Sequence, residues 1–223
     1  MSLLDSHQRE LQRAKTFLVP AGATVSIHAR GSKVAQCFLD SMGVDYAKLI
    51  PQMSATVNLG GGALLHSGIR HEKNIIEHAA YLLTSRPSSE VAFELFDEWI
   101  GKLNIDPDNV ADPRVARAVS LIKENYAENV SVNTVAASVG LSVPRLSQLF
   151  KQVTGLPIRR FRLWYRIFAT ASKIGRGYTL TDAAIASGFA DYPQMCRVFR
   201  ELTGAKPATA RDNTEIRVLA ECY

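Results

Sequence analysis

Residues 135–155 read VAASVGLSVPRLSQLFKQVTG, which is a short apolar stretch, a glycine turn and a longer amphipathic stretch that ends at a second glycine. The apolar residues of the longer stretch recur at i, i+3, i+4 and i+7, the period of a helix with one buried face, and they are Leu146, Leu149, Phe150 and Val153. Gly140 has no Cβ and tolerates the left-handed backbone of a sharp turn, and Ser142 follows it as a predicted N-cap. The stretch therefore predicts a helix-turn-helix.

The same pattern returns at 183–204, which read AAIASGFADYPQMCRVFRELTG. An offset of 48 aligns the first helices and the turn glycines, and after one inserted residue an offset of 49 aligns the second helices to their closing glycines. Residues 157–175 between the copies predict one helix about 25 to 28 Å long. Such a connector can hold two recognition helices about one turn of DNA, roughly 34 Å, apart.

The charge is distributed unevenly along the chain. The 223 residues carry a formal net charge of +5, yet residues 1–106 contain 10 basic and 11 acidic residues, so the excess of positive charge lies in the second half. The stretch 129–181 contains no acidic residue and eight basic ones. A one-sign field of this kind attracts a polyanion, although a solvated surface that aids solubility is the alternative for a charge run alone.

A resemblance to a known family rests on three of these segments. GLSVPRLSQLFKQVTGLP at 140–157, the following IRRFRLWYRIFATASKI, and IASGFADYPQMCRVFRELTGAKPATAR at 185–211 resemble the C-terminal domain of AraC/XylS family bacterial transcription regulators. The resemblance covers about residues 113–212. It implies seven helices with two helix-turn-helix units, binding of double-stranded DNA at a non-palindromic site, and control of transcription with RNA polymerase as a possible partner.

The resemblance has two departures, both in the second unit. That unit opens with an acidic and hydrophobic stretch, residues 190–193, and carries Met195 where the family usually has an aromatic residue. The base preference of this half therefore stays open, as do the operator sequence and the choice between activation and repression.

The outward sides of the two predicted recognition helices supply the candidate DNA contacts. Arginine can pair with guanine O6 and N7 and glutamine with adenine N6 and N7, each contributing about 1 to 3 kcal/mol of discrimination. The candidate base-reading residues are Arg145, Ser147, Gln148, Tyr192, Gln194 and Arg197. Later basic residues and those of the connector are candidates for phosphate contacts, namely Lys151, Arg159, Arg160, Arg166 and Arg200. For any single arginine the alternative is a solvated or internally paired side chain.

The N-terminal half is expected to be a small β-rich domain followed by two helices, which makes the chain α+β overall. Short β-branched runs bounded by Gly, Pro or Asn predict strands at 16–19, 24–28, 34–39, 56–59 and 63–65. Apolar periodicity predicts helices at about 70–84 and from Ser88 to Leu103. The segment TFLVPAGATVSIHARGSKVAQCFLD resembles part of a cupin-like sensory domain, of which about half to two-thirds of the strands would fit here.

These expectations divide the chain into four parts. Residues 1–105 form an effector-binding or dimerisation domain, 106–112 a linker, 113–212 the DNA-binding domain and 213–223 a tail. The linker prediction rests on two prolines with Asn and Asp in IDPDNVADP, and Asp112 is expected to cap the helix that follows.

Catalytic and metal motifs are missing from the sequence. His71 and Glu72 begin like a zinc H-E-x-x-H motif, but Ile75 occupies its last position. Gly60–Gly62 lacks the Gly-Lys-Ser/Thr of a P-loop, and the three cysteines form no C-x-x-C pair. We therefore predict no enzyme activity, no metal, no cofactor, reduced thiols and, since no apolar run approaches about 18 residues, a cytoplasmic protein that does not enter a membrane.

The predicted function is sequence-specific transcription regulation, modulated by a small molecule through residues 1–105. A homodimer is the expected state because an apolar stripe including Trp99 needs a cover. Two alternatives stay open. In one, the N-terminal domain serves only for protein contacts, and in the other it is a small cupin-type enzyme attached to a DNA-binding domain.

Overall fold

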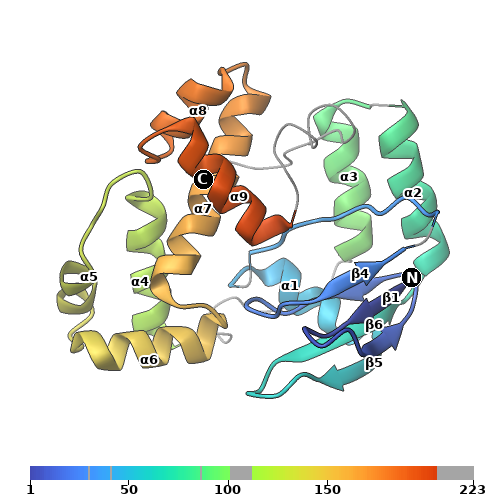
Figure 1. Ribbon diagram of the computed structural model, residues 1–223, viewed down its shortest axis with the longest axis horizontal. Coiled ribbons are helices and arrows are strands. Elements are labelled where there is room, and N and C mark those ends of the chain that lie inside the picture. The colour runs from blue at the N-terminus through green and yellow to red at the C-terminus, as the bar shows by residue number, and fades with distance from the viewer. Residues whose placement is uncertain (30, 41, 86, 101–111, 205–223) are drawn as a thin grey trace. The chain divides into compact units, whose positions relative to one another are not determined.

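The computed structural model describes residues 1–29, 31–40, 42–85, 87–100 and 112–204. The chain divides into two compact units, the first unit of residues 1–111 and the second unit of residues 112–223 (Figure 1). The first unit contains both sheets and the second is helical, which confirms the α+β class. The predicted linker, apart from Asp112, and the predicted tail lie outside the described residues.

The first unit contains two three-stranded antiparallel sheets. One has the order β2(Glu10–Arg13), β1(Ser2–Leu4), β4(Ser26–His28), and the other has the order β3(Phe17–Leu18), β6(Leu64–Ile69), β5(Met53–Asn58). In the longest pairing Thr56 lies opposite His66 and Val57 opposite Leu65. Alternation along β5 leaves every second residue half-buried, as expected for a strand with one covered face.

Four of the five predicted strands overlap observed ones, and the prediction for 34–39 is wrong. That segment contains no strand in the structure, and its Val34 and Phe38 are exposed despite their β-forming character. The hairpin of β1 and β2 was not predicted because β2 has no β-branched residue. Its turn depends on Asp5, whose carboxylate accepts hydrogen bonds from the backbone N–H groups of His7 and Arg9 at 2.8 and 2.9 Å.

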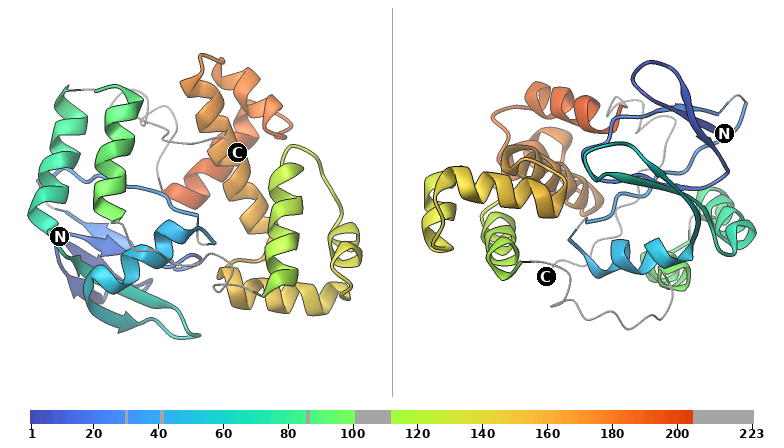
Figure 2. Two further views of the ribbon diagram at one scale, coloured as in Figure 1. Left: turned by 180° about the vertical axis from the view of Figure 1, so that it is seen from behind. Right: turned by 90° about the horizontal axis from the view of Figure 1, so that it is seen from below.

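The helices of the first unit are α1(Val44–Leu49), a 3-10 turn (Ile50–Gln52), α2(Glu72–Ser85) and α3(Ser89–Ile100). The short α1 was not predicted, whereas α2 and α3 match the predicted pair and lie side by side (Figures 1 and 2). Trp99 Nε1 donates to His78 Nδ1 at 2.9 Å, and the two rings stack. The Trp99 face of α3 therefore already has a partner within the unit.

The second unit begins with the predicted helices in the predicted order. They are α4(Pro113–Glu124), α5(Val132–Ser138), α6(Val143–Thr154), α7(Ile158–Gly175), α8(Leu180–Ala186) and α9(Tyr192–Thr203). Asp112 caps α4 by accepting from the Arg114 N–H, and Ser131 caps α5 by accepting from the Thr134 N–H. Ser142 is the N-cap residue of α6, as predicted, although its side chain makes no cap hydrogen bond.

Two apolar clusters form along α7. At its N-terminal end α4, α5 and α6 bury Val115, Val135, Leu146 and Phe150, and the Phe150 ring meets Phe161 of α7 edge to face at 5.3 Å. Near the middle of α7, Ile167 packs with Ala184 of α8, Met195 of α9 and Phe189 of the turn between them. Helix α7 as a whole is about 27 Å long.

The described part of this unit contains six helices. Its residues from 205 onward lie outside the description, so the seventh helix stays a prediction. None of the helices in the described ranges combines the length and apolar content needed to cross a membrane.

Candidate nucleic-acid interface

Helix α6 presents a polar face opposite its buried one. Leu146, Leu149 and Phe150 are buried, whereas Arg145, Ser147, Gln148 and Lys151 are exposed. The helix begins after Gly140 in a left-handed turn and ends at Gly155, also left-handed, whose N–H donates to Lys151 O. The buried apolar stripe therefore fixes which polar residues face outward.

Two of these residues form a pair on adjacent turns. Arg145 Nη1 donates to Gln148 Oε1 at 3.1 Å, and both side chains are exposed. The contact aligns the guanidinium and the amide on one surface while leaving further donors on both groups. The donors that remain on the two groups are complementary to the acceptors that guanine offers in the major groove.

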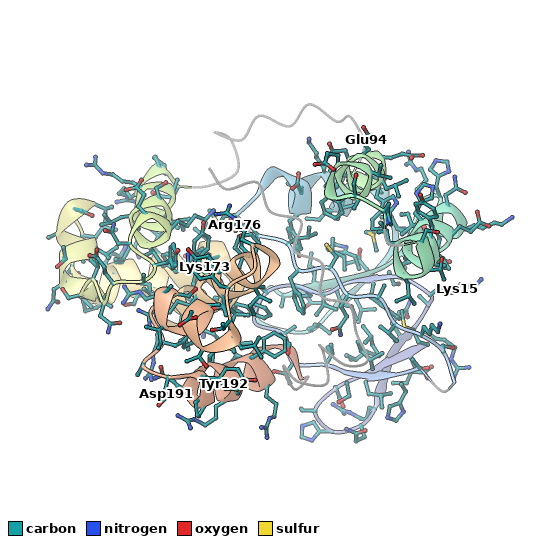
Figure 3. All side chains as sticks on the ribbon, turned by 90° about the horizontal axis from the view of Figure 1, so that it is seen from above. Lys15, Glu94, Lys173, Arg176, Asp191 and Tyr192 are labelled. Carbon is teal, nitrogen blue, oxygen red and sulfur yellow. The ribbon has the colours of Figure 1, made fainter. Side chains whose placement is uncertain are left out.

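Helix α9 begins differently from α6. Asp191 Oδ1 accepts from the Gln194 N–H at 2.6 Å, and Gln194 Oε1 accepts in return from the Ala190 N–H at 2.8 Å. The carbonyl oxygen of Gln194 is thus used by the cap, and the half-buried Tyr192 packs against the Met195 cluster. Asp191 and Tyr192 mark this end of the helix in Figure 3. Among the candidates for base reading on α9, Arg197 is the exposed one.

The candidate phosphate contacts separate by exposure. Lys151, Arg159 and Arg200 are exposed, and Arg160 is half-buried. Arg166 is 7% exposed. Its guanidinium donates to Tyr126 O at 2.8 Å and to Asn129 Oδ1 at 3.0 Å, both in the loop between α4 and α5.

The structure therefore corrects the prediction for Arg166. Its Nε and Nη2 donate inside the unit and its side chain is buried, so it is not placed to contact a phosphate in this conformation. Burial, together with the charge of Arg162 nearby, lowers the pKa of Arg166 below the ordinary arginine value. A buried cation held by neutral oxygens stabilises the loop instead of contributing to the surface field.

Known proteins share the helix-turn-helix pattern of the second unit. A family profile described as a helix-turn-helix domain matches residues 135–213, which include both turns, both recognition helices and the connector. The HTH-type transcriptional regulator RipA of Corynebacterium glutamicum is 28% identical over 135 residues, and the Arabinose operon regulatory protein of Escherichia coli is 34% identical over 111 residues.

The C-terminal unit carries a helix-turn-helix domain. The RipA match covers 55% of this chain and 41% of RipA, and the Arabinose operon match covers 48% of this chain and 37% of that regulator. The chain thus matches about two-fifths of the length of these curated relatives. A solved AraC-type transcriptional regulator from Chromobacterium violaceum is similar with a TM-score of 0.42 and 26% identity, over 46% of this chain and 92% of that one.

Sequence reasoning missed a group of residues in the helix-turn-helix domain. Arg162 Nη2 donates to Val130 O at 2.8 Å, and Lys173 Nζ donates to the Tyr126 hydroxyl at 3.0 Å. Lys173 is labelled on α7 in Figure 3. These partners are 32 to 47 residues apart in sequence, and no local spacing signals a contact over that separation.

The described residues contain no group of three or more His, Cys, Asp or Glu side chains that could hold a metal ion. His66 is buried on β6, and its Nδ1 lies 2.9 Å from the Thr56 hydroxyl. Burial lowers the pKa of His66 and so favours its neutral form. The ring is thus part of a cross-strand hydrogen bond.

Proposed function

We propose that this chain is a sequence-specific, DNA-binding transcription regulator that inserts α6 and α9 into successive major grooves of double-stranded DNA. The observation that carries the proposal is the exposed Arg145 and Gln148 pair on α6, set above a buried apolar face that recurs in α9. A connector of about 27 Å suits two helices that enter grooves one turn apart.

The two helices divide the work of recognition in this proposal. Arg145, Ser147 and Gln148 read base edges from α6, and Arg197 reads them from α9, with Tyr192 and Gln194 available only if the start of α9 rearranges. Lys151, Arg159, Arg160 and Arg200 contact phosphates and contribute affinity without sequence information.

Selection of bound sequences from a random duplex pool tests the proposal. We expect an asymmetric site with two elements about one helical turn apart, bound with a steep dependence on salt. Arg145→Ala should weaken selectivity at one element and Arg197→Ala at the other. Lys151→Ala should reduce the log-log salt slope by about 1 without changing base preference. Binding with no enriched sequence would contradict the proposed base reading.

In the same proposal, the N-terminal unit receives a small-molecule signal and pairs two copies of the chain into a homodimer. RNA polymerase is the proposed partner on DNA, and the cytoplasm is the proposed place of action. Exposed apolar residues on α2 support self-association, in particular Ile76, Tyr81 and Leu83. A dimeric mass at micromolar concentration, lowered by Ile76→Glu, is the expected result.

Protein contact without a small molecule is the second candidate for this unit, and the same exposed residues of α2 favour it. A panel of metabolites that raises the melting temperature of the first unit would support sensing. Stoichiometric bound metal on elemental analysis would instead support the cupin-type enzyme.

A further inference from the structure

The loop between α4 and α5 is held from one side by three cationic side chains of α7. Arg166 donates to Tyr126 O and Asn129 Oδ1, and its Nη2 also lies 3.4 Å from Ala127 O and from Glu128 O. Arg162 adds a bond to Val130 O, and Lys173 a bond to the Tyr126 hydroxyl. Nearly every residue from 126 to 130 therefore has a contact with α7.

The same loop touches the second helix-turn-helix at its turn glycine. A Cβ placed on Gly188 would lie 2.4 Å from Ala127 O and 2.8 Å from Ala127 Cα, which is closer than non-bonded atoms can approach. Gly188 therefore allows the turn between α8 and α9 to pack directly on the loop backbone. A side chain there would have to displace the turn or the loop.

The first turn offers a natural control for this contact. Gly140 is the counterpart of Gly188, and both have a positive φ, +66° and +86°. A Cβ on Gly140 would meet nothing within 4 Å. Substitution of either glycine by alanine strains the backbone, but only the substitution of Gly188 also pushes on the loop.

The loop at 126–130 is thus the place where the two helix-turn-helix copies meet. It connects α4 to α5, both of which pack against α6, and it contacts the turn that leads into α9. The planar guanidinium of Arg166 bonds several oxygens at once, so it fixes the loop in direction as well as in distance.

We propose that Arg162, Arg166 and Gly188 are positioning residues that set the distance and angle between α6 and α9, and through them the spacing of the two DNA elements. The inference rests on the proposed function, in which both helices read DNA. It adds that the spacing preference depends on the loop at 126–130 and not on the connector α7 alone.

Binding to a series of duplexes tests this proposal. The series carries the two selected elements with zero, one or two base pairs inserted between them, together with duplexes that hold one element alone. Each inserted base pair rotates the second element by about 35° and moves it by about 3.4 Å. The proteins are the full-length wild type, Gly188→Ala, Gly140→Ala, Arg166→Lys and Arg162→Gln.

We expect Gly188→Ala, Arg166→Lys and Arg162→Gln to reduce the preference for the native spacing by about tenfold, in the range by which residues between two sites change their coupling. Their affinity for a single element should stay close to that of the wild type. Gly140→Ala should weaken binding at every spacing alike. If Gly188→Ala gives the same spacing profile as Gly140→Ala, the inference is wrong.

A measurement without DNA separates this inference from the proposed function. Spin labels at Gln152→Cys on α6 and Glu201→Cys on α9, with Cys37→Ser, Cys196→Ala and Cys222→Ser, report the distance between exposed, equivalent positions of the two helices. We expect one narrow distance distribution that Gly188→Ala and Arg166→Lys broaden or shift and Gly140→Ala does not.

The outcomes then separate clearly. If no DNA sequence is enriched, but the spin-label distance distribution is narrow and Gly188→Ala broadens it, the proposed function is wrong and the positioning role stands. If a two-element site is enriched, but Gly188→Ala, Arg166→Lys and Arg162→Gln change neither the distance distribution nor the spacing profile, only the positioning role is wrong.

Discussion

The two helix-turn-helix units end their recognition helices alike and begin them differently. The last residue of each helix is a threonine, Thr154 in α6 and Thr203 in α9. Its hydroxyl donates to the carbonyl oxygen four residues earlier at 2.8 Å, and the next residue is a left-handed glycine. At the beginning Asp191 caps α9 together with Gln194, whereas Ser142 makes no cap bond on α6.

The difference shows which parts of a duplicated unit are free to change. Arg145 and Gln194 occupy equivalent positions, yet Arg145 reaches an exposed glutamine while Gln194 turns back to the Ala190 N–H. The frame of buried residues and closing glycines is retained because packing requires it, whereas the first turn can serve either recognition or capping. We infer that α6 supplies more sequence information than α9.

The largest expected difference lies between two equivalent phenylalanines. Phe150 is fully buried and contacts Phe161, whereas Phe199 is half-buried at the edge of its cluster. Phe150→Ala should lower the free energy of unfolding of the second unit by about 4 kcal/mol and Phe199→Ala by about half as much. Urea unfolding followed by circular dichroism measures both. Equal losses would mean that the two clusters are equally packed.

The next effect concerns how the loop at 126–130 is joined to α7. Arg166→Met removes a buried guanidinium and leaves the carbonyls of the loop without donors, which should cost about 3 kcal/mol of unfolding free energy. Arg159→Met, on the exposed side of the same helix, is the control and should change stability by less than about 0.5 kcal/mol. A small loss for Arg166→Met in urea unfolding would show that water replaces the guanidinium at little cost.

A smaller effect compares base reading at the equivalent positions 145 and 194. Arg145→Ala should lose about 1 to 3 kcal/mol of discrimination at one base pair, measured with duplexes that carry single substitutions. Gln194→Ala should change discrimination less, and it should lower stability by about 1 kcal/mol because the α9 cap loses a partner. Greater loss of discrimination in Gln194→Ala would reverse the assignment of the two helices.

The smallest effect is a pH dependence at the start of the second unit. Hydrogen bonds from the Arg114 side chain and backbone lower the pKa of Asp112 to about 2. Because the folded pKa lies below the unfolded one, the stabilisation by Asp112 is present above about pH 4 and is lost as the pH falls toward 2. The melting temperature of Asp112→Asn should therefore fall less steeply than that of the wild type between pH 5 and 2.5. Parallel curves would show that the carboxylate has no such role.

The sequence predicted the second unit far better than the first. The helices from α4 to α9 follow from local apolar periods, with cap residues or closing glycines at several of their ends, and the repeat supports each copy with the other. In the first unit the pairings of β1 with β4 and of β3 with β6 join residues far apart in sequence, and no local pattern specifies them. The exposed 34–39 segment shows the converse error, because β-branched residues formed no strand without a partner.

The candidate interface divides along the same line. The sequence by itself determined that α6 and α9 are amphipathic and which side faces outward, because the helical period fixes the orientation of every residue once the buried stripe is known. It also determined the exposure of Arg145, Gln148 and Arg197.

Only the tertiary structure decided which arginines are available to DNA and what joins the two helix-turn-helix copies. Arg159 and Arg166 lie on one helix, yet the first is exposed and the second is bound to a loop about 40 residues away in sequence. Gly140 and Gly188 look equivalent in the repeat, yet one faces open space and the other the Ala127 backbone. The physical reason is that a hydrogen bond or a close approach between distant segments depends on how the helices pack, and that packing is absent from any local sequence pattern.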